Sequence, residues 1–172
     1  MDFYFVLKKR VSVRKYEQKT VEKEKIYNIL AAASLAPSAG NLQSYKIYVV
    51  YNKKLKEDIS AACYEQEFVR DAPVVFVFCA DKERAYSKYE ERGYELYAIQ
   101  DATIAAAYVQ LAAVVEGLGS VWVGAFDPLE ISRLLSLPSH TVPVVVLPLG
   151  YPSETPQPHE RRPINEIVEE VK

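Results

Sequence analysis

A short stretch near the N-terminus places three hydrogen-bond donors at alternate positions. Residues 10–14 read Arg-Val-Ser-Val-Arg. In an extended chain, residues i, i+2 and i+4 point to one face, so Arg10, Ser12 and Arg14 would converge there. Two guanidinium forks and a hydroxyl form a good donor set for a phosphate or a ring carbonyl. The pattern predicts an anion-binding strand, and it also fits an amphipathic edge strand whose charges are solvated.

A second basic group follows a proline-rich segment near the C-terminus. It comprises His159, Glu160, Arg161 and Arg162. By itself it fits a solvated surface run, and it becomes a binding element only if it folds back beside residues 10–14. The net charge of the chain is −2, which argues against a nucleic-acid or anionic-membrane partner. Local cationic clusters on such a protein suit one small anion.

The residues that usually carry out covalent or metal catalysis are not arranged for it here. His140 and His159 are far apart in sequence and outside any triad signature. Cys63 and Cys79 lack CxxC spacing, so we expect reduced core thiols and no disulfide framework or zinc site. The six glycines form neither a GxGxxG motif nor a P-loop. We therefore expect no catalytic nucleophile, no metal and no Rossmann-type dinucleotide site.

These residues must be positioned by a packed globular fold. The 172 residues fit one domain over 1–172, and apolar residues make up 49% of them. The expected helices span residues 2–9, 22–35, 55–63, 98–117, 128–135 and 164–171. The expected strands span residues 10–16, 45–51, 74–79, 121–123 and 142–149. Because there are no regular βαβ repeats, the fold class is α+β.

The sequence also predicts how the helix over residues 22–35 begins and ends and what surrounds the helix over residues 98–115. Thr20 is the expected N-cap of helix 22–35, and Pro37 ends it and begins a turn-rich loop. The helix over residues 98–115 is apolar around most of its circumference, so we expect a second subunit to cover part of it. We expect this stretch to be too polar and too short to span a bilayer. With no signal-peptide pattern at the N-terminus, we expect a cytoplasmic protein that does not bind membranes.

Five stretches, in order, together resemble the FMN-dependent nitroreductase family. They read RVSVRKY, ASLAPSAGNLQSYKIYVV, VRDAPVVFVFCAD, GLGSVWVGAFDP and LGYPSETPQPHERRPINEIV. The resemblance covers nearly the whole chain, and its specificity lies in the ordered set. It implies an α+β fold with a central, mainly antiparallel sheet flanked by helices. It also implies an intertwined homodimer with two FMN sites at the subunit interface.

The resemblance assigns FMN contacts to four segments. From the early R-x-S-x-R motif come Arg10, Ser12 and Arg14. From the P-S-x-x-N loop, which packs on the flavin of the partner subunit, come Pro37, Ser38, Ala39, Asn41 and Gln43. From the segment after G-L-G, which lies along the isoalloxazine, come Val123, Gly124 and Ala125. The phosphate ligand near the C-terminus is Arg161, with Arg162 as the alternative.

The sequence departs from the family pattern in three places. The usual N-x-Q-P-W motif ends here in Ser44 and Tyr45, and Val11 replaces the second arginine of an R-R-S start. The excursion between Asp81 and Gln100 is short for the family. Because that excursion helps to shape the substrate pocket, the resemblance carries least weight for substrate preference.

The proposed ligands suit flavin chemistry, which needs no catalytic side chain. The isoalloxazine accepts a hydride at N5, and the protein supplies position and electrostatics. An arginine near N1 and the C2 carbonyl, Arg10 or Arg14, would favour the reduced flavin. The Asn41 amide offers a donor and an acceptor to the pyrimidine edge. Gly124 lets the backbone approach N5 closely.

The resemblance therefore predicts an NAD(P)H-dependent FMN oxidoreductase. A ping-pong cycle would pass electrons to a small acceptor such as a nitroaromatic, a quinone or a flavin. Two alternatives stay open: a flavin-binding carrier or sensor without turnover, and a specialised flavin-fold enzyme of the flavin-destructase or dehalogenase type. Candidate walls of a substrate pocket are Tyr45, Tyr86, Tyr89, Tyr94, Tyr97 and Phe126, although most of the 13 tyrosines must be ordinary packing or surface residues.

Overall fold

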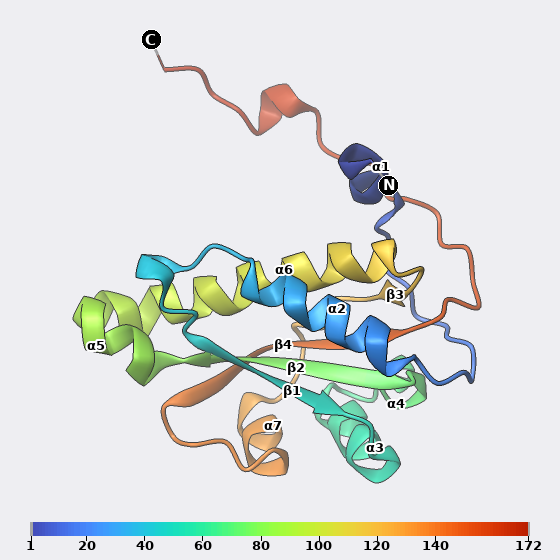
Figure 1. Ribbon diagram of the computed structural model, residues 1–172, viewed down its shortest axis with the longest axis horizontal. Coiled ribbons are helices and arrows are strands. Elements are labelled where there is room, and N and C mark those ends of the chain that lie inside the picture. The colour runs from blue at the N-terminus through green and yellow to red at the C-terminus, as the bar shows by residue number, and fades with distance from the viewer. Residues whose placement is uncertain (1, 172) are drawn as a thin grey trace.

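Four antiparallel strands form the sheet at the centre of the structure (Figure 1). The computed structural model describes residues 2–171. The strands lie in the order β1-β2-β4-β3 and comprise β1 (Tyr45–Val50), β2 (Val74–Asp81), β3 (Gly119–Ser120) and β4 (Thr141–Gly150). In the register of the central strands, Phe76 lies opposite Val49 on one side and Leu147 on the other. The expected α+β class and antiparallel sheet are confirmed.

Helices cover both faces of this sheet (Figure 1). One face carries α2 (Lys23–Ser34) and α6 (Ala98–Val115). The other carries α3 (Lys53–Ala62), α4 (Glu67–Asp71) and α7 (Pro128–Leu134). Beside the start of α6 lie α5 (Lys82–Arg92) and a π-helical turn, Gly93–Tyr97. At the other end, α1 (Phe3–Lys9) and the C-terminal tail project away from the sheet.

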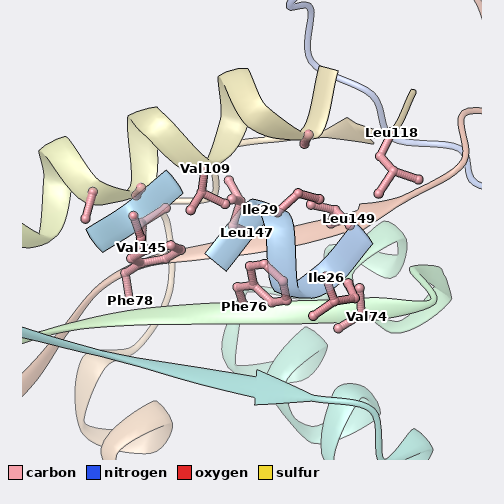
Figure 2. Packing of buried hydrophobic residues seen from close by; sticks show 14 of the residues in the cluster. Ile26, Ile29, Val74, Phe76, Phe78, Val109, Leu118, Val145, Leu147 and Leu149 are labelled. Atoms are coloured by element: carbon pink, nitrogen blue, oxygen red, sulfur yellow. The ribbon is translucent and has the colours of Figure 1, made fainter. Parts of the chain in front are cut away.

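The central strand β2 contributes side chains to two hydrophobic clusters, one on each face of the sheet. Phe76 and Phe78 join Ile29 of α2 and Val109 of α6 in the first cluster (Figure 2). Val77 and its alternate neighbours join the cluster beneath α3, α4 and α7. Successive side chains of a strand point to opposite faces, so a strand covered on both faces must be apolar throughout. This explains the unbroken apolar run in β2.

The long helix α6 is the main helix of the first cluster. It packs against α2 and the sheet, with Ala105, Ala106 and Val109 fully buried. The helical stretch Lys82–Val115 has the length and apolar composition of a membrane span, but half of its most apolar window is buried within the protein. Its role here is that of a core helix. Tyr108 and Val115 remain exposed on its outer side.

The structure corrects the start of the helix expected over residues 22–35. Its N-cap is Glu22, not Thr20. The backbone is not yet helical at Val21, whose side chain is 4% exposed in the first hydrophobic cluster. Burial of this valine therefore moves the helix start beyond the threonine.

Two other predicted elements differ from the structure. The strand expected over 121–123 is β3, two residues earlier, and Val123 keeps only an isolated bridge to Val146. The helix expected over 164–171 is reduced to one 3-10 turn, Ile164–Glu166. Ile164 and Ile167 are 73% and 62% exposed, so no packing supports a helix that would be marginal alone.

Candidate functional site

Residues 10–14 form an extended segment fixed against β3. The Val13 N–H donates to the Ser120 carbonyl at 3.0 Å, and Ser12 forms a parallel bridge with Ser120. Val13 is buried, whereas Ser12 is half-buried and Arg14 is exposed. A Cβ on Gly119 would lie 2.6 Å from Cγ2 of Val13, so this close approach requires glycine. The strand expected over residues 10–16 is reduced to isolated bridges, and burial alternates clearly only between Val13 and Arg14, because Arg10, Val11 and Ser12 are all half-buried.

Arg10 feels the positive charge of the second basic group. This half-buried guanidinium has its pKa lowered by burial and, second, by the positive charge of Arg161. Within residues 2–171, neither arginine has a carboxylate within 4 Å. Two neighbouring, unneutralised guanidinium groups suit a doubly charged anion such as a phosphate ester. Arg162 instead pairs with Glu166 at 3.4 Å, which leaves Arg161 as the better ligand.

Arg14 lies at the opposite end of this segment, beside α4. Its guanidinium carbon lies 5.8 Å from the ring centroid of Phe68. The backbone N–H groups of Arg14 and Lys15 donate to one carboxylate oxygen of Glu154 at 2.6 and 3.1 Å. This carboxylate ties the C-terminal tail to the N-terminal strand while leaving the Arg14 side chain at the surface.

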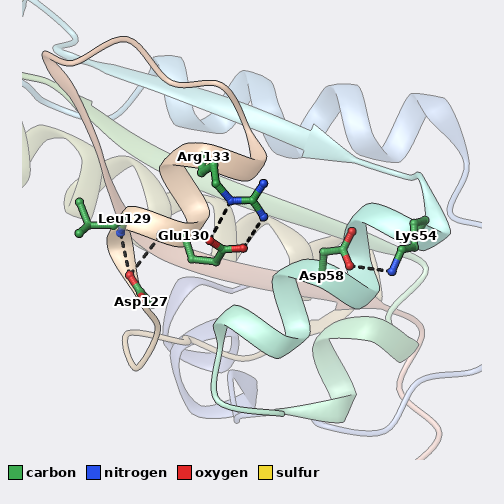
Figure 3. Close-up of polar contacts among 6 residues, drawn as sticks. All are labelled: Lys54, Asp58, Asp127, Leu129, Glu130 and Arg133. Carbon is green, nitrogen blue, oxygen red and sulfur yellow. Dashed lines mark hydrogen bonds and ion pairs between the residues drawn. The ribbon is translucent and has the colours of Figure 1, made fainter.

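The segment after the G-L-G sequence passes close to the same helix. Val123 exchanges two backbone hydrogen bonds with Val146, both of 3.0 Å. The Gln66 amide donates to the Ala125 carbonyl at 3.1 Å, and the Asp127 carboxylate caps α7 through the Leu129 N–H at 2.9 Å (Figure 3). The segment is thus held at both ends around Gly124.

The backbone at Gly124 and Ala125 is open to a ligand. Both residues are exposed, and within the described chain their N–H groups donate to no protein acceptor. A Cβ on Gly124 would meet only the Trp122 ring, at 3.7 Å. Free N–H groups on an anchored segment suit a ring atom that accepts a hydrogen bond.

The loop over residues 37–43 has an unusual backbone. Gly40, Asn41 and Gln43 have φ values of 54°, 59° and 50°. Non-glycine residues in this left-handed region are uncommon, and such strain is often found at ligand-binding sites. The Gln43 amide donates to the Asn41 side-chain oxygen at 2.9 Å, and its backbone N–H donates to the Ser38 hydroxyl at 3.0 Å.

A buried carboxylate of α6 holds this loop. Asp101 is 2% exposed and accepts the Ala39 N–H at 2.9 Å and the Ser44 N–H at 3.1 Å, one with each oxygen. Hydrogen bonds to an ionised acceptor are among the stronger ones in proteins. Asp101 therefore fixes the two ends of the strained segment. Pro37, before it, is exposed.

The predicted contacts form two groups at opposite ends of α6. Val11 and Val13 line one cavity, of about 410 Å³, with Val114, whereas the loop is bound to Asp101. At 1.5 Å per helical residue, Asp101 and Val114 are about 20 Å apart. Figure 1 shows the loop beside α5 and residues 10–14 beside β3. One copy of the chain therefore cannot close both groups around a single small ligand.

Three residues that contribute to these groups were not predicted from the sequence. Phe68 belongs to a five-residue helix too short to give a periodic pattern, and Gln66 is the N-cap of that helix. Asp101 did carry a signal, because an acidic residue stands out in so apolar a helix. Its partners, however, are backbone amides 57 and 62 residues away, which no local pattern reveals.

The group at β3 matches the chemistry of FMN. Arg10 and Arg161 provide positive charge for a phosphate, and Ser12 and Arg14 provide further donors along the same face. The free N–H groups near Gly124 suit the isoalloxazine ring. Asn41, Ser38 and Ala39 of the distant loop fit only if they come from a second copy.

The chain matches a known protein family over most of its length. The model of the Nitroreductase family matches residues 7–69 and 60–151. An NADH dehydrogenase of Thermus thermophilus is 32% identical over 187 residues, covering 93% of this chain and 91% of that protein. An NAD(P)H-dependent FMN reductase of Bacillus subtilis is 33% identical over 165 residues, covering 88% and 66%.

A solved structure supports the same assignment. The NADPH:FMN oxidoreductase of Vibrio harveyi, determined in complex with NAD+, superimposes with a TM-score of 0.91 at 25% identity. The similarity covers 98% of this chain and 76% of that one. With its fold, its ordered motifs and its sequence relatives in agreement, this chain belongs to the nitroreductase family.

Proposed function

We propose that this protein is an FMN-dependent oxidoreductase that transfers electrons from NAD(P)H to a small acceptor, a nitroaromatic, a quinone or a flavin. The observation that carries the proposal is the match of the Nitroreductase family to residues 7–69 and 60–151, which include the Arg10–Arg14 segment held against β3. Relatives named as an FMN reductase and an NADPH:FMN oxidoreductase support the choice of cofactor and electron donor.

The residues at β3 bind and orient the cofactor in this proposal. Arg10 and Arg161 bind the phosphate, and Arg14 places positive charge beside the ring, where it favours the reduced state. Val123, Gly124 and Ala125 offer backbone N–H groups to the ring edge. When bound, FMN supplies the hydride-accepting centre, for which the protein provides no side chain.

A second copy of the chain completes the site. Because the loop over residues 37–43 is about 20 Å from the basic strand along α6, we assign its contacts to the site of the other subunit. Asn41 then offers its amide to the pyrimidine edge, while Ser38 and Ala39 lie against the ring. Exposed apolar residues of α1 and the tail, among them Phe3, Tyr4, Ile164 and Ile167, support a homodimer.

Donor and acceptor use the same position in turn. The sequence contains no dinucleotide-binding motif of its own, so NAD(P)H binds transiently over the flavin and leaves before the acceptor arrives. This order gives ping-pong kinetics. We place the enzyme in the cytoplasm, where NAD(P)H is available.

Absorption spectroscopy tests the proposal directly. The purified protein should be yellow, and NADH or NADPH should bleach the flavin band under anaerobic conditions. A colourless protein that takes up no FMN on titration would refute the proposal. Bound FMN that stopped-flow mixing with NADH and NADPH leaves oxidised would instead identify a flavin carrier.

A further inference from the structure

Three side chains of α5 lie against the strained loop. Arg84 donates through Nε to the Leu42 carbonyl. Nζ of Lys88 and the hydroxyl oxygen of Tyr89 each lie 2.5 Å from the position that a Cβ on Gly40 would occupy. We call Arg84, Lys88 and Tyr89 the α5 rim. Lys88 and Tyr89 thus lie directly against the backbone of Gly40, so rim and loop form one surface.

The rim carries positive charge without a protein counter-charge. Within residues 2–171, no carboxylate lies within 4 Å of Arg84 or Lys88. Neighbouring basic side chains differ, since Lys82 pairs with Glu95 at 3.3 Å and His140 lies 3.2 Å from Glu83.

Two acidic residues of the excursion lie at another cavity. Glu83 and Glu91 line a separate cavity of about 380 Å³ with Tyr86, Tyr94 and His140. Arg84 and Lys88, four residues apart, share one helical face directed at the loop. Arg84 and Lys88 therefore place two positive charges beside the loop.

Tyr89 is held in place by its neighbours. Its ring packs edge-to-face on Tyr97, with centroids 5.1 Å apart and an interplanar angle of 86°. The Tyr97 hydroxyl accepts a hydrogen bond of 2.9 Å from Arg92. Lys88 lies 5.5 Å from the centroid of the Tyr89 ring, a distance that permits a cation–π contact. The rim thus combines a fixed aromatic side chain with a cation.

We propose that Arg84 and Lys88 recognise an oxyanion on the substrate, so that the enzyme prefers planar substrates bearing a carboxylate or phosphate. The inference rests on the proposed function, in which the loop over residues 37–43 lies at the flavin. A rim fixed to that loop then borders the position that donor and acceptor share. Tyr89 lies beside the planar part of the substrate, and the two cations bind its anionic group.

The anionic group has two possible sources, which a matched set of substrates distinguishes. One is the carboxylate of an aromatic acceptor, and the other is the extra phosphate by which NADPH differs from NADH. The acceptor pair is 4-nitrobenzoate and 4-nitrobenzyl alcohol, which share the ring and nitro group but differ in charge. The measured quantity is the ratio of kcat/KM values within each pair, using FMN-loaded protein.

Lys88→Gln removes the charge while leaving a polar side chain. Loss of a charge-assisted hydrogen bond should lower the ratio for one substrate pair about tenfold. Lys88→Arg should restore most of the preference. Lys54→Gln is the matched control, because Lys54 is an exposed lysine of α3 on the other face of the sheet, paired with Asp58 at 2.8 Å.

The two outcomes of this experiment are distinct. A fall confined to 4-nitrobenzoate identifies the acceptor carboxylate, and a fall confined to NADPH identifies the donor phosphate; either supports the rim. Ratios unchanged in Lys88→Gln, or lowered equally in Lys54→Gln, would overturn the inference.

A binding measurement separates this inference from the proposed function. Calorimetric titration of the purified protein with 4-nitrobenzoate and with 4-nitrobenzyl alcohol gives the same ratio as Kd values, without turnover. A protein whose flavin NAD(P)H cannot reduce would refute the oxidoreductase but still test the rim. Kd ratios that are equal in wild type and Lys88→Gln, both for this pair and for NADP+ against NAD+, would refute the rim alone.

Discussion

At the residue scale, the arginines of the N-terminal strand differ in their surroundings. Arg10 is half-buried and next to a second cation, whereas Arg14 is exposed beside the Phe68 ring. A group that is partly desolvated near like charge gains most from an anion that neutralises it. Arg10 therefore suits the phosphate, and Arg14 suits the ring system.

Replacing Arg14 with Ala should weaken FMN binding by about 1.5–3 kcal/mol, the range of a charge-assisted hydrogen bond. Fluorescence titration of the apoprotein with FMN measures the change. Arg133→Ala is the control, because Arg133 is an exposed arginine of α7 that pairs with Glu130 (Figure 3). Equal affinity in Arg14→Ala and wild type would show that the strand does not lie at the flavin.

The two cysteines should not react with thiol reagents in the folded protein. Both are buried, and burial raises the pKa of Cys63 and Cys79 from 9.0 to about 12. Because the thiolate is the reactive form, Ellman's reagent should label neither thiol at neutral pH until denaturant is added.

The same shift sets a pH dependence of stability. Above pH 9.0 the unfolded thiols ionise while the folded thiols stay protonated up to about pH 12. The unfolded state is thereby favoured, so the thiols lower the free energy of unfolding as the pH rises through this window. Cys63→Ala should show a smaller decline than wild type in urea titrations, and rapid labelling of native protein would contradict the assignment.

The sequence allowed prediction of the residues that act through local geometry. The buried cysteines follow from composition, and the structure confirms them, whereas the alternation predicted over residues 10–14 is clear only at Val13 and Arg14. The clamp by Asp101 and the rim over Gly40 depend on contacts between distant segments. Such contacts leave no periodic trace in a single sequence.

At the element scale, the loop over residues 37–43 depends on one carboxylate of α6. Asp101→Asn keeps the size of the side chain but presents an NH₂ group to one of the two amides. Leaving a buried donor unpaired should lower the free energy of unfolding by about 1–3 kcal/mol. The Ala39 and Ser44 amides should also exchange faster with deuterium.

Asp127→Asn provides the matched control for this variant. Asp127 also accepts two backbone N–H groups, at 2.9 and 3.2 Å, but at the exposed N-cap of α7. Asparagine is a good N-cap, so stability should change little there. Unchanged exchange at the loop amides in Asp101→Asn would show that the clamp does not hold the loop.

Helices and strands were predicted correctly where their own residues form the core, and incorrectly where their formation depends on contacts with distant parts of the chain. The apolar strands β2 and β4 were found because the core itself selects their residues. Thr20 failed as a cap because burial of Val21 delayed the helix, a tertiary effect. The helix predicted over 164–171 failed because its apolar residues have no partner surface within one copy of the chain.

At the scale of the whole molecule, the exposed tail points to self-association. Ile164, Ile167 and Val168 are 73%, 62% and 55% exposed. Burial of each on a second copy should contribute about 1.5 kcal/mol to the dimer. Replacing all three with Ser should therefore shift the protein toward monomer in sedimentation experiments. Glu169→Ser is the control, and an unshifted equilibrium would exclude the tail from the interface.

The distance between the ends of α6 predicts that two different inactive variants can complement each other in a mixed dimer. If each flavin is enclosed by residues 10–14 of one copy and the loop over residues 37–43 of the other, two chains with different lesions can together form one intact site. A mixed pair of Arg14→Ala and Asp101→Asn chains would contain one centre with both lesions and one with neither. A purified mixed pair should have about half the activity of the wild-type pair, and co-expression of the two alleles, in which about half of the pairs are mixed, should restore about a quarter, which neither allele achieves alone.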